Sequence, residues 1–324
     1  MRWMIGARLV ACRKLHMTKQ GCSMTSFLKP GIAPDPVPSV QPYIPRILWQ
    51  TSKDRSKISP ELMGCVNALK AMNPGWEHRL LDDESQLAAL REVCSDRFLR
   101  AYARIQPRYG AARADLFRYV MVYLHGGAYL DLKSGTTRPL DEILRPDDHF
   151  IISQWDNGPD GMFPGIGTRK TLKVPGGEYE QWFVIASPGH PFLKETLERA
   201  LHNIENFNPF VFGYGGKGVL NVMGPNLYTH AIRSLEKDFP NRHICAWPEG
   251  LRYTMLQDLN AHQKLDKGHY GHVTLSPVTS VGLTGAALFR FKALEVLYAP
   301  VAFLRGLNNK RLDARRAKKA AARG

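Results

Sequence analysis

The sequence has no long apolar run and little cysteine. Nothing in it approaches the roughly 18 consecutive apolar residues of a membrane-spanning helix, so no such helix is predicted. The five cysteines are scattered, odd in number and without a C-x-x-C pair. That pattern argues against a disulfide framework or a zinc ribbon and fits a reducing compartment. No internal repeat is evident, and 44% hydrophobic with 23% charged residues is typical of a soluble globular protein.

A phosphate-binding loop of the form G-x-x-x-x-G-K-[ST] is also absent, because Val211 stands where its first glycine is needed. The residues from Gly213 to Gly218 do spell G-x-G-x-x-G. They come too late in the chain for the first strand-to-helix turn of a dinucleotide-binding fold. We expect a flexible loop there instead.

Acidic residues are missing from the first 30 residues, which carry six basic side chains. Residues 305–324 carry eight basic side chains against one acid, Asp313, so the two ends hold +13 of the net charge of +15. The rest of the chain is close to neutral. This charge lies on no recognisable nucleic-acid-binding motif, so we expect no nucleic-acid partner. Basic tails are more often solvated or drawn to acidic membrane surfaces.

Composition divides the chain into four segments. Residues 1–42 are basic and proline-rich, and we expect an extended leader that lies outside the fold. Residues 43–283 form the folded body, which we expect to be a single domain. Residues 284–304 predict an amphipathic helix that either docks on the body or lies in a membrane interface. Residues 305–324 predict a basic, disordered tail.

Strand-like and helix-like patterns alternate along the body, as in an α/β fold. The residues before the central stretch predict strands at 44–50 and 76–81 and helices at 59–72, 86–93 and 96–105. Those after it predict strands at 150–155, 181–186 and 242–247 and helices at 191–205 and 226–238. Residues 156–178 are rich in glycine and proline and are long for a loop, which favours a functional lid or binding loop.

The most informative stretch runs from Tyr109 to Leu140. Its first half predicts a helix that ends at Gly126-Gly127, and residues 128–130 then predict a short buried strand. Asp131 comes directly after the strand, which suggests the mouth of an α/β sheet, where such folds bind ligands. Asp115 and Arg118 share one helix face, and Asp131 and Lys133 would point the same way in an extended chain. The alternative is an intrahelical ion pair with a solvated turn after it.

The residues A-R-A-D-L-F-R-Y, then G-G-A-Y-L-D-L and R-P-L-D, resemble the sugar-nucleotide-binding core of glycosyltransferase family 32. The segments I-P-R-I-L-W-Q at 44–50, N-P-G-W at 73–76 and M-G-P at 223–225 are similar to further landmarks of that family, in the same order. The resemblance spans roughly residues 43 to 280. It implies a glycosyltransferase A type fold, in which a mixed, mostly parallel sheet is flanked by helices. It also implies transfer of a hexose from a nucleotide diphosphate sugar to a glycan or glycolipid acceptor, with retention of configuration.

The resemblance assigns roles to five residues. Asp115 and Arg118 would hold hydroxyls of the donor sugar, and Arg113 would brace their helix against the site. Asp131 would contact the ribose or sugar and, with any divalent metal, the diphosphate. Trp49 would stack on the donor base, although a buried core tryptophan is the usual fate of this residue type. The sequence singles out no enzymic base.

The sequence departs from the family pattern at Lys133, which stands where a second metal-binding aspartate is usual. A protonated lysine repels a metal ion, but its ammonium can itself hydrogen-bond phosphate. We therefore expect Mn²⁺ or Mg²⁺ to be used, if at all, with reduced dependence. His269 and His272 are candidate metal ligands beside Asp131, because many enzymes of this fold take a ligand from their C-terminal region.

Two further expectations concern class and place. With its second aspartate lost, the chain could instead be a degenerate domain that binds a sugar nucleotide or a glycan without turnover. The basic tail and its neighbouring helix predict a cytoplasmic protein that is peripheral to an anionic membrane, or one in the Golgi lumen if the source is eukaryotic.

Overall fold

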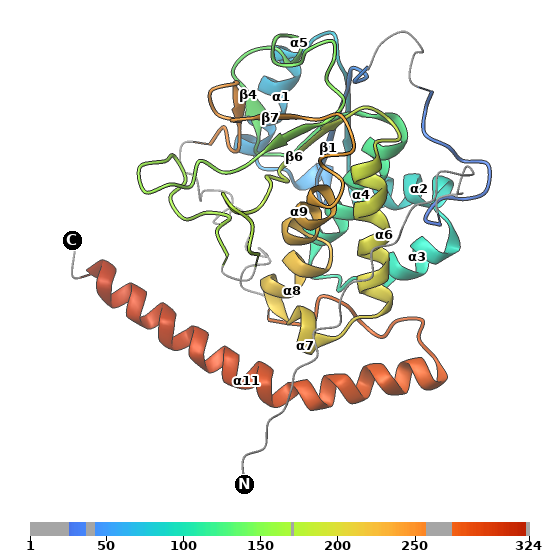
Figure 1. The fold of residues 1–324 in the computed structure, drawn as a ribbon, viewed down its shortest axis with the longest axis vertical. Coiled ribbons are helices and arrows are strands. Elements are labelled where there is room, and N and C mark those ends of the chain that lie inside the picture. The colour runs from blue at the N-terminus through green and yellow to red at the C-terminus, as the bar shows by residue number, and fades with distance from the viewer. Residues whose placement is uncertain (1–25, 37–42, 170–171, 257–273, 322–324) are drawn as a thin grey trace.

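The structure is a computed structural model that describes residues 26–36, 43–169, 172–256 and 274–321 (Figure 1). At its centre lies a four-stranded sheet in the order β2 (Glu77–Leu81), β1 (Ile47–Thr51), β3 (Gly127–Leu130) and β6 (Phe183–Ala186). β1 is parallel to β2 and to β3, whereas β6 is antiparallel to β3. The expected mixed, mostly parallel sheet is confirmed.

Two further pairs of strands are short. β4 (Gly135–Thr136) pairs with β8 (Leu251–Arg252) in antiparallel fashion, and β5 (Ile151–Ser153) pairs in parallel with β7 (Arg242–Ile244). β4 lies shortly after β3 in sequence, so its pairing brings residues near 253 to the end of the central sheet. That placement matters for the site.

Helices cover both faces of the central sheet. Trp49 and Tyr129 face one core cluster, which includes residues of α4 (Gly110–His125) and α6 (Pro191–Glu205), whereas Leu48 and Ala128 face the other, which includes residues of α1 (Pro60–Met72) and α5 (Leu140–Ile143). This alternation is the period of two expected of strands buried on both sides. The remaining helices of the described residues are η1 (Arg55–Lys57), α2 (Asp83–Val93), α3 (Asp96–Ala103), α7 (Pro209–Phe212), α8 (Gly215–Val222), α9 (Pro225–Arg233) and α11 (Gly285–Ala321).

Helix α4 is buried on all sides rather than along one stripe. Every residue from Asp115 to Leu124 is buried, because α4 contacts α6, α2 and the sheet. Gly126 ends the helix at φ 66°, and Gly127 has φ 95°. A Cβ atom on Gly127 would lie 2.4 Å from the carbonyl oxygen of Ile47. Only glycine therefore allows the chain to turn from α4 into β3 so close to β1.

The prediction of a flexible loop at residues 213–218 is wrong in its second half. α8 begins at Gly215 and continues through Val222. A Cβ atom on Gly218 would lie 2.5 Å from the carbonyl oxygen of Gly213. The glycines therefore serve close packing of a helix on the turn before it, rather than flexibility.

The leader is not wholly outside the fold, because residues 26–36 pack on the body. Phe27 and Leu28 are buried, and Phe27 lies 5.3 Å from the ring of Tyr123. The Ser95 amide donates to the Phe27 carbonyl (3.0 Å), and Leu28 forms a β-bridge with Cys94. Two adjacent large apolar side chains bury enough surface to hold a short segment that is otherwise polar and proline-rich.

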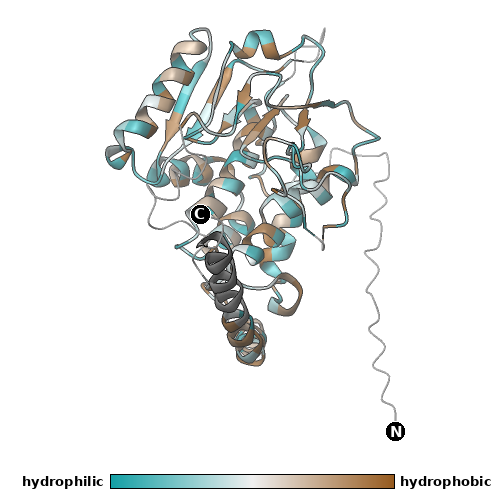
Figure 2. Ribbon diagram, turned by 90° about the vertical axis from the view of Figure 1, so that its left-hand side faces the viewer, coloured by the Kyte–Doolittle hydropathy of each residue, from teal (hydrophilic) through white to brown (hydrophobic). Residues whose placement is uncertain are grey.

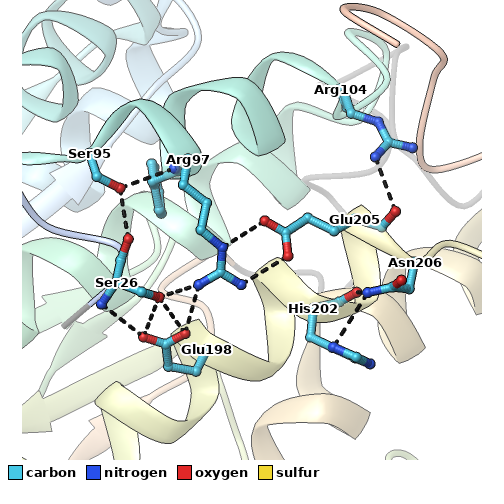
Figure 3. A network of polar contacts seen from close by, with 9 residues as sticks. Ser26, Ser95, Arg97, Arg104, Glu198, His202, Glu205 and Asn206 are labelled. Atoms are coloured by element: carbon cyan, nitrogen blue, oxygen red, sulfur yellow. Dashed lines mark hydrogen bonds and ion pairs between the residues drawn. The ribbon is translucent and has the colours of Figure 1, made fainter. Parts of the chain in front are cut away.

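An ion-pair network fixes this segment to α3 and α6 (Figure 3). Arg97 pairs with Glu198 (3.1 Å) and with Glu205 (2.7 Å). The hydroxyl of Ser26 donates to Glu198 (2.7 Å) and accepts a hydrogen bond from Arg97. We call residues 26–36 the N-terminal strap.

The C-terminal helix is longer than the sequence predicts. α11 runs without a break from Gly285 to Ala321, through the boundary expected at residue 304 and through most of the expected disordered tail. Alanine, leucine, lysine and arginine dominate this segment and are strong helix formers. Pro300 lies inside the helix, which bends near its middle (Figure 1). Among the described residues, no helix is both long and apolar enough to cross a membrane.

Candidate functional site

A cavity of about 970 Å³ lies at the carboxyl ends of the parallel strands. Thr51 ends β1, Asp83 lies just after β2 and Asp131 just after β3, and all three line the cavity. The carboxyl ends of parallel strands meet at one edge of a sheet, so residues that are distant in the chain converge there. The first half of α4, the loop between β5 and β6 and the segment at 274–275 close the other sides.

Asp115 and Arg118 form a buried ion pair at the floor of the cavity. Arg118 Nη2 lies 3.1 Å from Asp115 Oδ1, and the two side chains are only 9% (Asp115) and 6% (Arg118) exposed. The guanidinium also lies 4.2 Å from the centre of the Tyr129 ring and donates to the carbonyl of Gln181 (2.6 Å). The intrahelical ion pair that the alternative describes is present, but it is enclosed and lines the cavity.

Asp131 lies between two cations. Its Oδ1 atom is 3.3 Å from Arg118 Nη1 and accepts a hydrogen bond from the Tyr129 hydroxyl (3.2 Å), and its Oδ2 atom is 3.3 Å from Lys133 Nζ. Lys133 is 9% exposed, and its ammonium lies 4.1 Å from the centre of the Tyr253 ring. The turn after β3 is therefore enclosed rather than solvated. The structure brings Asp115, Arg118, Asp131 and Lys133 into one connected network.

The two carboxylates of this network have opposite electrostatic environments. Burial raises the pKa of Asp115 to about 7, against the opposing effect of Arg118 and with a further rise from Asp131. Burial also acts on Asp131, but Lys133 and Arg118 outweigh it and lower the pKa of this carboxyl below its usual value. At neutral pH Asp131 is therefore charged, whereas Asp115 is close to the midpoint of its titration.

Trp49 does not lie in the cavity. It is 2% exposed, its Nε1 donates to the carbonyl of Gly126 (3.0 Å), and its ring stacks on His125 (5.9 Å between ring centres) and lies 4.8 Å from the guanidinium carbon of Arg79. The base-stacking role assigned to it by resemblance has no open ring face to use. Trp49 is therefore a buried core tryptophan, which is the usual fate of this residue type. Its side chain packs on the α4 side of β1 and does not reach the cavity at the end of the strand.

Arg113 also lies outside the cavity lining. Its guanidinium lies 5.8 Å from the centre of the Tyr102 ring, and its Nη2 donates to the carbonyl of Ile105 (3.5 Å). These contacts join the start of α4 to the residues just before it. His269 and His272 lie outside the described residues, so the structure says nothing of their expected metal role.

The residues around Asp131 do not fit a divalent cation. Both carboxylate oxygens already face cationic nitrogen atoms, and a metal ion there would have to displace Lys133 or lie against it. Across the described ranges, no group of three or more His, Cys, Asp or Glu side chains is arranged to hold a metal ion.

Sequence reasoning missed several residues that line the cavity. Tyr129 precedes Asp131 by two positions on the same strand face, a spacing that could have been used. Tyr253 gave no local signal, because it reaches Lys133 only through the pairing of β4 with β8. In the loop between β5 and β6, Trp155 lines the cavity beside the ion pair of Arg169 with Glu178 (2.9 Å). The length of this loop predicts a binding role but does not identify the residues that have it.

Residues 59–150 match the family described as "Glycosyltransferase sugar-binding region containing DXD motif". The initiation-specific alpha-1,6-mannosyltransferase of Schizosaccharomyces pombe is 27% identical over 203 residues, covering 58% of this chain and 48% of that protein. Inositol phosphoceramide mannosyltransferases 1 and 3 of the same organism are 28% and 36% identical, covering 56% and 53% of this chain and 53% and 39% of their own lengths.

The chain thus spans about half the length of the first two of these curated relatives. Among solved structures, the PaToxG glycosyltransferase is similar with a TM-score of 0.43 and 14% sequence identity, over 60% of this chain and 70% of that one. The matched region contains Asp115, Arg118, Asp131 and Lys133, the four residues that the structure connects at the cavity floor.

Proposed function

Because the chain carries a glycosyltransferase sugar-binding region homologous to those of the mannosyltransferases, we propose that it is a glycosyltransferase that moves a hexose from a nucleotide diphosphate sugar to a glycan or glycolipid hydroxyl. The observation that carries this proposal is the enclosed network of Asp115, Arg118, Asp131 and Lys133. Four ionisable side chains converge on the floor of one large cavity. Buried charge is costly unless it is paired. Clusters of buried ionisable side chains that line a cavity are typical of functional sites.

Transfer of a glycosyl group requires that the donor sugar be held in a fixed orientation while the acceptor oxygen approaches the anomeric carbon. Carboxylate and guanidinium groups on a buried helix can do this by hydrogen bonding to sugar hydroxyls. In the proposed site Asp115 and Arg118 have that role. Their positions are fixed by the packing of α4 on all sides, and the Gln181 carbonyl and the Tyr129 ring further orient Arg118.

Departure of the diphosphate leaves growing negative charge, which the site must stabilise. The residues present do not fit a metal ion at Asp131, so we assign this stabilisation to the ammonium of Lys133. Asp131 and the ring of Tyr253 hold that ammonium in the cavity lining. A lysine donates up to three hydrogen bonds as a point charge and is a common phosphate ligand. The expected consequence is activity with little or no dependence on Mn²⁺ or Mg²⁺.

The names of the relatives favour mannose as the hexose. Those proteins are an initiation-specific alpha-1,6-mannosyltransferase and inositol phosphoceramide mannosyltransferases, so their names include both a glycan-type and a lipid-type acceptor. We extend mannose to this chain and keep the acceptor as a glycan or glycolipid. Retention of configuration is carried over from the resemblance to family 32. The loop around Trp155 and Arg169 is the part of the cavity lining that we assign to the acceptor side.

The experiment is a panel of nucleotide diphosphate sugars tested on the purified full chain. Binding is measured as a rise in melting temperature, since a ligand at 100 times its Kd stabilises a protein by about 2.7 kcal/mol. Turnover is measured in parallel as release of nucleoside diphosphate, with and without glycan and glycolipid acceptors. Binding with turnover supports the proposal, and the mannose donor is expected to act best. Binding without turnover under any condition would identify a degenerate binding domain instead.

A further inference from the structure

Helix α11 has two apolar faces, and the described residues cover only one of them. Phe291 and Tyr298 are seven residues apart, about two helical turns, and are 5% and 1% exposed. Tyr298 packs on Tyr214 (4.8 Å between ring centres) and on Phe210 (5.1 Å) beside α7 and α8. Phe291 lies 6.3 Å from Phe207. This face is sufficient to hold the first half of α11 against the body.

The second face repeats the same spacing in solvent. Phe289, Val296 and Phe303 are also seven residues apart and are 77%, 72% and 67% exposed. A step of two residues turns a helix by about 200°, so these residues lie roughly opposite Phe291 and Tyr298. Leu297 and Leu304 lie beside them and are 65% and 64% exposed. We call these five residues the outer stripe.

An outer stripe of this kind needs an occupant. Single exposed apolar side chains are normal on soluble proteins, whereas a contiguous row along one helix face marks an interaction surface. The first half of the helix passes below α7, and its second half extends away from the body (Figure 1); the helix lies at the lower end of the body in the view turned by 90° (Figure 2). Because its side chains are 64% to 77% exposed, the outer stripe lies on the side of α11 that the described body does not cover.

The charge of the helix decides between two kinds of occupant. Residues 285–321 contain nine basic side chains and two acidic ones, a net charge of +7, and most of the basic residues lie beyond residue 304. A second copy of the helix would carry the same charge of +7, so the two helices would repel each other. An anionic lipid surface is complementary to it, because basic residues near such a surface are attracted to its acidic headgroups. Amphipathic helices with apolar and basic faces lie in the plane of such surfaces.

We propose that α11 docks the protein on an anionic lipid bilayer, with the outer stripe inserted at the boundary between headgroups and acyl chains and the basic C-terminal half bound to the acidic headgroups. This docking is independent of the proposed glycosyl transfer. Its failure and the failure of that activity are therefore measured separately.

The test is partition of the full-length protein between buffer and sedimented vesicles of phosphatidylcholine, with and without phosphatidylserine. The protein should sediment with the anionic vesicles at least ~10-fold more strongly than with the neutral ones, and added salt should weaken this binding. The double variant Val296→Gln/Phe303→Gln should lose about 10-fold or more of the binding to anionic vesicles, since two large side chains no longer insert. Glutamine is a good helix former, so the helix itself is preserved.

The matched control is Ala287→Gln/Ala302→Gln, which places the same polar groups on the side of the helix opposite the outer stripe, at an exposed and a half-buried position. It should bind anionic vesicles like the wild type. The proposal would be overturned if Val296→Gln/Phe303→Gln, the stripe variant, bound anionic vesicles as strongly as the wild type. It would also be overturned if the control lost as much binding as the stripe variant.

Sedimentation velocity tests for a second copy of the chain as the occupant. A dimer that the stripe variant abolishes, in a protein that ignores vesicles, would show that a second copy is the occupant.

Discussion

Arg118 is the residue on which the connected site depends most. Its guanidinium pairs with Asp115 and Asp131, lies over Tyr129 and donates to the Gln181 carbonyl. Removing one partner from a buried ion pair costs about 3–5 kcal/mol, because the remaining charge stays buried. Replacement of Arg118 by alanine would therefore report on folding as much as on function. Variants that conserve shape, such as carboxylate-to-amide changes, separate the two effects.

Asp115→Asn should make the protein more stable at neutral and alkaline pH. Burial raises the pKa of Asp115 to about 7, so the folded state keeps a proton between about pH 4 and pH 7 that the unfolded chain has already released. The stability from this site is present at low pH and is lost as the pH rises through about 7. The asparagine variant lacks this loss, so its unfolding free energy should exceed that of the wild type by about 1–3 kcal/mol at pH 8.

Urea unfolding of both proteins between pH 4 and pH 8 measures this difference. The gap between wild type and Asp115→Asn should close as the pH falls toward 4. A gap that is independent of pH, or a variant less stable than wild type at pH 8, would mean that Asp115 keeps a normal pKa in the folded protein.

Lys133→Asp should create dependence on a divalent metal. The change replaces the ammonium beside Asp131 with a second carboxylate, which is the ligand type that Mn²⁺ and Mg²⁺ prefer. Wild-type turnover should persist in chelator, whereas turnover by Lys133→Asp should fall by about 100-fold in chelator and recover with manganese. Calorimetry should detect manganese binding by the variant and none by the wild type. Wild-type activity that chelator abolishes and manganese fully restores would contradict the role given to Lys133.

At the scale of elements, the junction of α4 with β3 decides where Asp131 lies. Gly127→Ala should destabilise the protein by several kcal/mol, about 3 or more, because an alanine at φ 95° is strained and its Cβ would meet the Ile47 carbonyl at 2.4 Å. The backbone of β1 cannot yield without breaking the sheet. Denaturant unfolding gives the measurement.

Gly64→Ala is the control for that substitution. Gly64 is exposed inside α1, has no positive φ, and has nothing within 4 Å of an added Cβ. Alanine there should stabilise the protein by about 0.5–1 kcal/mol, since it favours the helix over the unfolded chain. Similar effects of the two substitutions would show that the α4–β3 junction does not constrain Gly127.

The same junction explains how much could be predicted from the sequence. A buried helix, two glycines, a short strand and an aspartate are all set by neighbouring residues, so local patterns predicted them. The place of Tyr253 in the site was not predictable from the sequence. Its carbonyl accepts a hydrogen bond from the Ser134 hydroxyl, and these two residues are 119 positions apart in the chain. The face on which Trp49 lies was also not predictable, because β1 is buried on both sides and its pattern does not distinguish them.

At the scale of the whole molecule, the N-terminal strap belongs to the folded body. Phe27→Ala should cost about 3–4 kcal/mol of unfolding free energy, because the ring is fully buried against Tyr123. Tyr43→Ala, at a position that is 45% exposed, should cost less than about 1 kcal/mol. Urea unfolding of the two variants tests this. If both variants lose less than about 1 kcal/mol of unfolding free energy, residues 26–36 do not contribute to the stability of the fold.

The sequence predicts that the strap lies outside the fold, because basic and proline-rich residues surround it. Only two large apolar side chains, Phe27 and Leu28, mark the contact, and such a short run has no periodicity to recognise. Its partners Glu198 and Glu205 lie on α6, far along the chain, so the network in Figure 3 depends on tertiary structure. The observed length of α11 differs from the prediction for another reason: a high density of charge predicts a disordered tail, whereas lysine, arginine and alanine also favour helix.

The most direct measurement is release of nucleoside diphosphate from nucleotide diphosphate mannose by the wild type, by Asp131→Asn and by Glu195→Gln. Asp131 lies at the cavity floor between Arg118 and Lys133, whereas Glu195 pairs with Arg199 on the surface of α6. We predict turnover by the wild type, a loss of about 100-fold or more in Asp131→Asn, and normal turnover in Glu195→Gln. Equal turnover by Asp131→Asn and wild type, or no turnover of any nucleotide sugar by the folded wild type, would contradict glycosyl transfer at this site.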